Sequence, residues 1–66
     1  MNVVANGKPY TLDELATIAT LLDAMNLSGR VVAVEVNGDA VLRSEHAARE
    51  LHDGDRVEVV RAVAGG

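Results

Sequence analysis

The sequence predicts an α+β fold in which one helix packs across one face of a mixed sheet of four to five strands. Three observations predict this fold class. Two Asn-Gly pairs, at residues 6–7 and 37–38, end short valine-containing runs, and Asn-Gly favours a hairpin turn because it tolerates positive φ angles. Residues 15–25 carry apolar side chains at helical spacing. The run RVEVVRAV near the C-terminus begins with the alternation of a half-buried strand.

The first segment predicts a β-hairpin. Its opening strand, MNVVA, places Met1, Val3 and Ala5 on one face and Val4 on the other, because successive side chains of a strand point to opposite sides. The first Asn-Gly turn follows. A second short strand is expected at residues 10–12.

The helix is expected within TLDELATIATLLDAMNLSG. Two starting points fit the sequence: Thr11 with Glu14 could form a capping box, and Thr17 is an equally good N-cap. We favour Thr17, because only the later start leaves residues 10–12 free to be a strand. The helix should stop near residues 26–29, where a Ser-Gly pair ends the periodic pattern. The predicted apolar stripe comprises Leu15, Ile18, Ala19, Leu22 and Met25.

Two strands should follow the helix. The run VVAVEV at residues 31–36 is the strongest strand signal, with Val32, Val34 and Val36 on one face. Beyond the second Asn-Gly turn, residues 40–42 are expected to form a short edge strand.

The polar segment at residues 43–55 predicts at most one helical turn, with Leu51 as a buried plug and a turn at Asp53-Gly54-Asp55. In the last strand Val57 and Val59 lie opposite Glu58, and the alternation then breaks down.

A hairpin, a crossing helix and later strands pack naturally as one mixed sheet with the helix on a single face. This architecture is the β-grasp. We expect residues 1–63 to form the domain and residues 64–66 to form a flexible Gly-Gly tail. In a β-grasp the first strand and the 31–36 strand flank the last, so their exposed apolar face is expected to bind partners. The predicted partner-binding residues are Val4, Val31, Ala33, Val60, Arg61, Ala62 and Val63.

Composition narrows the function. The chain has 66 residues, no cysteine, no Phe or Trp, and a net charge of -4. It therefore has no thiolate chemistry, and it is not expected to bind nucleic acid, which needs a basic surface. The N-terminal residues carry neither a basic region nor a long apolar run, so we expect no signal peptide, no membrane span and a cytoplasmic location.

Several stretches resemble the ThiS family of ubiquitin-like sulfur carriers: MNVVANG, TIATLLDAM, VAVEVNG, VLRSEHA and HDGDRVEVVRAVAGG. The last is the most specific, because Gly-Asp-Arg, an alternating strand and a terminal Gly-Gly occur in that order. Together the stretches cover almost the whole chain. Molybdopterin-synthase small subunits share the fold and tail but typically carry prolines just before the final residues. The only proline here is Pro9, which favours the ThiS branch.

The resemblance implies a co-substrate and not an enzyme, with no catalytic residue and no bound cofactor. A ThiF-like activating enzyme would use ATP to adenylate the carboxylate of Gly66. Sulfur from a donor such as a cysteine desulfurase would then replace AMP and leave a thiocarboxylate, which a ThiG-like thiazole synthase accepts. Glycine has no Cβ, so a slender tail of Ala64, Gly65 and Gly66 would fit a narrow channel in a partner.

The same tail leaves alternatives open. Carriers for molybdopterin, cysteine or thiosugar synthesis share it, and a ubiquitin-like modifier conjugated through Gly66 would use the same adenylate. A non-covalent binding module with an inert tail is a third possibility.

One constellation is set aside. His46 and Glu50 stand four residues apart, with His52 nearby, but the segment offers no third ligand at regular spacing and resembles no zinc motif. We therefore expect no metal site.

Overall fold

The structure is a computed structural model that describes residues 1–61. A hairpin of β1 and β2 is followed by helix α1, a second hairpin of β3 and β4, a 3-10 turn η1, and the last strand β5. Their bounds are β1 Asn2–Ala5, β2 Lys8–Thr11, α1 Ile18–Ala24, β3 Val32–Val36, β4 Asp39–Val41, η1 Arg43–Glu45 and β5 Arg56–Arg61.

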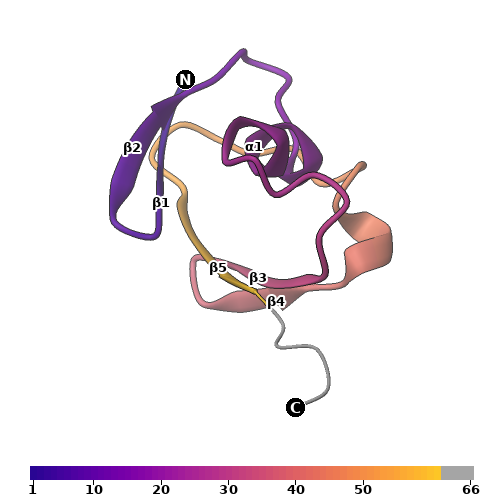
Figure 1. Cartoon of the computed structure of the whole chain (residues 1–66). Coiled ribbons are helices and arrows are strands. Elements are labelled where there is room, and N and C mark those ends of the chain that lie inside the picture. Colours follow the sequence, from indigo (N-terminus) through magenta and orange to yellow (C-terminus); the bar gives the residue numbers. More distant parts are fainter. Residues whose placement is uncertain (62–66) are drawn as a thin grey trace.

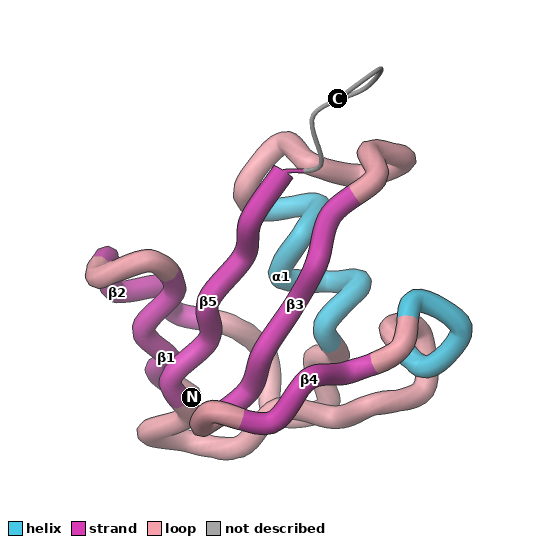
Figure 2. Tube along the Cα trace, turned by 90° about the horizontal axis from the view of Figure 1, so that it is seen from below, coloured by secondary structure: helices cyan, strands magenta, loops and turns pink. Residues whose placement is uncertain are grey.

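The five strands form one mixed sheet in the order β2-β1-β5-β3-β4. Strand β1 pairs with β5 in parallel, and the other neighbours are antiparallel. Figure 1 shows α1 lying across one face of this sheet, and Figure 2, turned to view the opposite face, shows β5 between β1 and β3. The predicted β-grasp arrangement, with the first and third strands flanking the last, is confirmed.

Both Asn-Gly turns also hold β5 in place. Asn6 and Asn37 have φ angles of 51° and 52°, in the left-handed region that a tight hairpin turn requires. The side-chain oxygen of Asn6 accepts from the Val59 N–H at 2.8 Å, and its Nδ2 donates to the Val59 carbonyl at 3.0 Å. Asn37 acts similarly on β3's side, where its Oδ1 accepts from the Arg56 N–H at 2.9 Å. The turn residues therefore extend the pairing of the central strand.

The core lies between the sheet and α1. Alternate residues of β1, β3 and β5 point to the helix and are buried, as their period of two predicts. Leu51 is only 2% exposed and closes the core from the polar segment, as predicted. The core cluster comprises Val3, Ala5, Ile18, Leu21, Leu22, Val32, Val34, Val36, Val41, Leu51, Val57 and Val59.

The helix begins at Ile18 with Thr17 as its N-cap, as the later of the two predicted starting points requires. The Thr17 hydroxyl accepts from the Thr20 N–H at 3.3 Å, and the Thr20 hydroxyl accepts from the Thr17 N–H at 3.2 Å. Two further N–H groups of the first turn donate to the segment after η1: Ile18 to the Arg49 carbonyl at 3.1 Å and Ala19 to that of His46 at 3.0 Å. These bonds satisfy groups that a helix start otherwise leaves unpaired. Among residues 1–61, no helix is long and apolar enough to cross a membrane.

The predicted helical stripe was wrong at its first position. Leu15 is 77% exposed, whereas Ala16 next to it is buried. The cause is the cap at Thr17, which leaves Leu15 in a turn before the helix. The buried helical side chains are Ile18, Leu21 and Leu22, so the predicted stripe also missed Leu21.

Several element ends differ from the sequence prediction by one or two residues. The helix ends at Ala24, shortly before the predicted end near residues 26–29, because Asn26 takes a left-handed φ of 61° and Leu27 N–H bonds back to the Leu22 carbonyl. Strand β2 begins at Lys8 and β4 at Asp39, because each two-residue turn lets pairing resume at once.

Replacing Asn6 with Asp should destabilise the fold. The change removes the Nδ2 donor and sets a carboxylate oxygen against the Val59 carbonyl, which should cost about 1–3 kcal/mol of unfolding free energy. Urea denaturation measures this. Asn26→Asp is the matched control, because Asn26 is exposed and also has a positive φ. Equal losses from both substitutions would contradict the bonding role of Asn6.

Candidate functional site

The central strand β5 carries the chain towards its C-terminus. Its last described residue, Arg61, pairs with Val32 at the start of β3. The C-terminal end of β5 therefore lies beside the N-terminal end of β3, as Figure 2 shows. The predicted site residues Ala62, Val63, Ala64, Gly65 and Gly66 lie outside the described residues, as does the predicted domain boundary after residue 63.

Three of the predicted partner-binding residues lie together at this end of the sheet. Ala33 and Val60 are direct cross-strand partners on the face away from α1. Val31 precedes β3 and continues its alternation, so its side chain lies on the same side as that of Ala33. Val31 and Val60 are 59% and 64% exposed. We call Val31, Ala33 and Val60 the apolar patch.

Val4 does not join the apolar patch. It lies on the same sheet face, but its register partner on β5 is Arg56. Four residues separate that position from Val60, or about 13 Å along a strand. The sequence indicated the correct face, but it did not fix how far β1 runs along β5.

Arg61 lies apart from the apolar patch, and its predicted role in partner binding stays a prediction. Strand alternation places its side chain on the opposite side from Val60, because adjacent residues of a strand face opposite ways. Its partner on β3 is Val32, a core residue. Arg61 remains exposed and therefore lies at the rim of the helix-side face.

Two carboxylates flank the apolar patch. Glu35 and Glu58 are direct cross-strand partners, two residues further along β3 and β5 from Ala33 and Val60. Both are exposed, and neither forms an ion pair with another of residues 1–61. Like charges directly opposite each other destabilise a sheet. The sheet face therefore presents an apolar patch next to an acidic pair, which suits a partner that has an apolar surface with a basic group beside it.

The sequence prediction missed this acidic pair. Each glutamate occupies an outward position of an alternating strand, a signal that is present in the sequence. That the two residues lie opposite each other depends on the β3–β5 register.

The histidines lie in different environments. His46 is buried and its backbone carbonyl accepts from α1, whereas His52 is exposed and its Nδ1 lies 3.9 Å from Asp55. Across residues 1–61, no three His, Cys, Asp or Glu side chains are grouped so that they could hold a metal ion.

Comparison with known proteins identifies the family of the chain. A sequence profile described as the ThiS family matches residues 3–66. The chain belongs to this family. The match extends through both terminal glycines.

Individual relatives of the ThiS-family chain support the assignment. The sulfur carrier protein ThiS of Thermus thermophilus is 43% identical over 61 residues, which cover 92% of this chain and 94% of the relative. A thiazole synthase of Paramagnetospirillum magneticum is 35% identical over 66 residues, all of this chain, but the chain spans only 20% of that protein's length. The crystal structure of the thiamine biosynthesis protein ThiS from Geobacter metallireducens has a TM-score of 0.80 at 38% identity, with both chains fully covered.

Replacing Glu58 with Gln should stabilise the fold. The change removes the repulsion with Glu35 and should raise the unfolding free energy by about 0.2–1 kcal/mol at low salt. The gain should shrink as salt screens the pair. Denaturant unfolding at two salt concentrations measures both effects. Glu50→Gln, at another exposed glutamate, removes the same net charge and serves as the control; an equal gain there would mean that total charge, and not the pair, is responsible.

Proposed function

We propose that this ThiS-family sulfur carrier of thiamin biosynthesis carries sulfur as a thiocarboxylate on Gly66 and delivers it to a thiazole synthase. The observation that carries the proposal is the family match, which continues past β5 to residue 66 and so includes the terminal Gly-Gly. The chain is a substrate of its partners and is not itself a catalyst.

The chemistry takes place at the terminal carboxylate. One oxygen of Gly66 attacks the α-phosphorus of ATP and displaces pyrophosphate, which leaves an acyl-adenylate. The outer sulfur of a persulfide, such as that carried by a cysteine desulfurase, adds to the carbonyl carbon. The C–S bond forms as the C–O bond to AMP breaks, which gives an acyl disulfide. A thiol then attacks the donor sulfur and breaks the S–S bond, so the thiocarboxylate is released and the two thiols are oxidised to a disulfide. A ThiF-like activating enzyme supplies the ATP site and the catalytic groups for these steps.

The tail length suits this role. Five residues follow Arg61, and fully extended they would span about 17 Å, at roughly 3.3 Å per residue. Glycine lacks a Cβ, so the last two residues can pass through a channel that larger side chains would block. A tail bound in this way would leave the apolar patch at the rim of the channel. We therefore assign the patch and the acidic pair to partner docking.

The thiazole synthase as acceptor is supported by one of the relatives. The full length of this chain matches about a fifth of a protein named thiazole synthase. A ThiS-like segment and the rest of that protein therefore share one polypeptide. Covalent linkage is a direct way to keep a sulfur donor next to its acceptor, because it raises their effective concentration.

Intact-protein mass spectrometry tests the thiocarboxylate. After incubation with ATP, sulfide and a ThiF-like enzyme, the mass should rise by the difference between sulfur and oxygen, and fragmentation should place the change on Gly66. A variant lacking Gly66 should keep the same circular dichroism spectrum, because the described sheet ends at Arg61, but should gain no mass. ATP-pyrophosphate exchange with that variant would rule out the tail as the substrate. A stable isopeptide to lysine would instead identify a protein modifier.

Val60→Asp should weaken binding to the activating enzyme. The substitution removes the valine side chain that would be buried in the complex, so binding loses about 1.5 kcal/mol or more. This corresponds to at least about a tenfold rise in Kd. Val4→Asp is the control at a separate position on the same face. Calorimetric titration with both variants measures the difference. If both weaken binding equally, the footprint covers the whole face and not the patch alone.

A further inference from the structure

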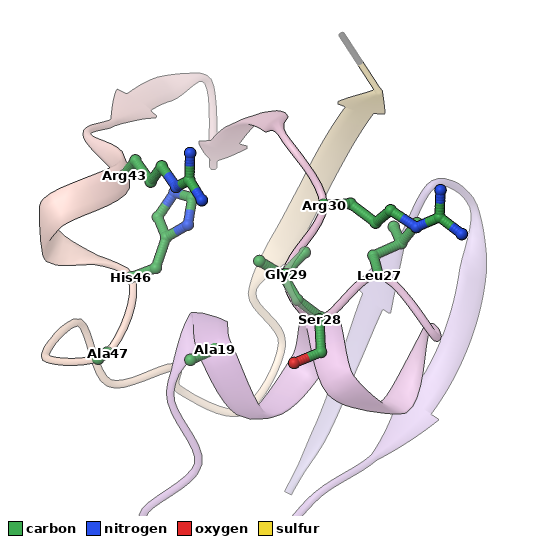
Figure 3. A pocket seen from close by; sticks show the side chains of 9 residues that line it. Ala19, Leu27, Ser28, Gly29, Arg30, Arg43, His46 and Ala47 are labelled. Carbon is green, nitrogen blue, oxygen red and sulfur yellow. The ribbon is translucent and has the colours of Figure 1, made fainter.

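A hollow of about 190 Å³ lies on the helix side of the fold. It is bounded by α1, the loop after α1, and the segment around η1. Figure 3 shows Arg43 and His46 on one side of it and the Leu27–Arg30 loop on the other. The apolar patch occupies the opposite face of the sheet, so the hollow is separate from the proposed docking surface.

His46 carries an unused hydrogen-bonding atom in this region. The residue is only 7% exposed, and its Nε2 has no hydrogen-bond partner among the described residues. Nearly all buried polar atoms in folded proteins have a partner, so an unpaired one needs an explanation. The His46 backbone is fixed, because its carbonyl accepts from the Ala19 N–H of α1 at 3.0 Å.

Arg43 stands next to His46 because of the local backbone. The His46 N–H donates to the Arg43 carbonyl at 3.2 Å, the i to i+3 bond of a 3-10 turn. Residues three apart in such a turn eclipse each other, so both side chains lie on one side of η1. Nε2 is shut off from solvent in the structure, and Arg43 is exposed. Contact between a ligand oxygen and Nε2 therefore requires a side-chain movement at the rim of the hollow.

The charge of the hollow contrasts with that of the chain. The protein has ten acidic residues against six Lys and Arg. The described residues that line the hollow nevertheless include Arg30, Arg43 and His46 and no Asp or Glu, although the Arg30 guanidinium points away from Arg43 and His46 (Figure 3). This local excess of cationic and hydrogen-bond-donating groups favours an anion. Guanidinium groups bind phosphate in a bidentate manner, which adds geometric selectivity to charge attraction.

The remaining lining residues indicate what accompanies the anion. Leu22, Leu27 and Ala19 provide an apolar floor, and Ser28 adds a hydroxyl. The volume exceeds that of a bare phosphate group. A ligand that used both parts of the hollow would carry a phosphate and a small apolar or aromatic body.

We propose that the hollow between α1 and η1 binds a small organic phosphate monoester. Arg43 holds the phosphate oxygens, His46 donates from Nε2, and the body of the ligand packs on Leu22 and Leu27. Binding there is compatible with partner docking, because the two regions lie on opposite sides of the sheet.

Phenyl phosphate is the test ligand, followed by two-dimensional amide NMR of the full chain. The amides of residues 27–30 and 43–47 should shift and saturate. Phenyl phosphate should bind at least tenfold more tightly than inorganic phosphate, which lacks the ring. It should also bind more tightly than benzoate, which lacks the phosphate.

Two variants test the assigned groups. Arg43→Gln, at an exposed position, should weaken phenyl phosphate binding at least tenfold. His46→Phe keeps the ring volume and removes the unpaired nitrogen, so it should preserve or raise Tm while weakening binding. Arg49→Gln is the control and should leave Kd within twofold, because Arg49 does not line the hollow. Unsaturable shifts, equal binding of benzoate, or an unchanged Kd in Arg43→Gln would each overturn the proposal.

Discussion

The position of β5 depends on asparagine side chains that act as strand neighbours. Strand β1 turns away at Asn6, so its parallel ladder with β5 covers only Val4 and Ala5. The Asn6 amide then bonds both backbone groups of Val59 and extends the pairing beyond the end of β1. On the other side of β5, Asn37 bonds the N–H of Arg56. The same two residues make the hairpin turns possible, because each takes a left-handed φ. Turn formation and the placement of the central strand are therefore coupled.

Period-two patterns made much of the fold predictable. Strand β3 alternates along its whole length and β5 alternates from Arg56 to Val60, and their buried faces follow directly from that alternation. The helix start was also predictable, because only a cap at Thr17 leaves residues 10–12 free to form a strand. Leu15 could not be placed from spacing alone: it fits a helical stripe, but the cap excludes it from the helix.

The apolar patch and the acidic pair were less predictable, because they depend on the register between neighbouring strands. Face assignment needs only the alternation of one strand, but adjacency needs the register of two. For this reason the sequence groups Val4 with Val31, Ala33 and Val60 and does not predict the Glu35–Glu58 pair. His46 lies in a polar segment without periodicity. Its burial follows from the docking of that segment on the first turn of α1, a tertiary contact that leaves no local pattern.

The two faces of the sheet have different electrostatic characters. The outer face pairs an apolar patch with two facing carboxylates that form no ion pair within residues 1–61, although Arg56 lines one hollow of this face together with both glutamates, and such like-charge pairing costs stability. A basic partner group would remove that cost on docking, so the same repulsion would favour the bound state. The helix side instead places Arg43 and His46 beside the hollow between α1 and η1. Ligands of opposite charge would therefore be directed to opposite sides of a very small domain.

The parallel pairing of the first and last strands also affects biosynthesis. Val4 and Arg56 are neighbours in the sheet but lie at opposite ends of the chain, so the contact order of the central ladder is high. A nascent chain cannot close this sheet until β5 has been synthesised. Prematurely terminated products would lack the central strand and remain open to proteolysis. Folding itself would thus act as quality control, because only chains in which β5 has been completed can close the sheet.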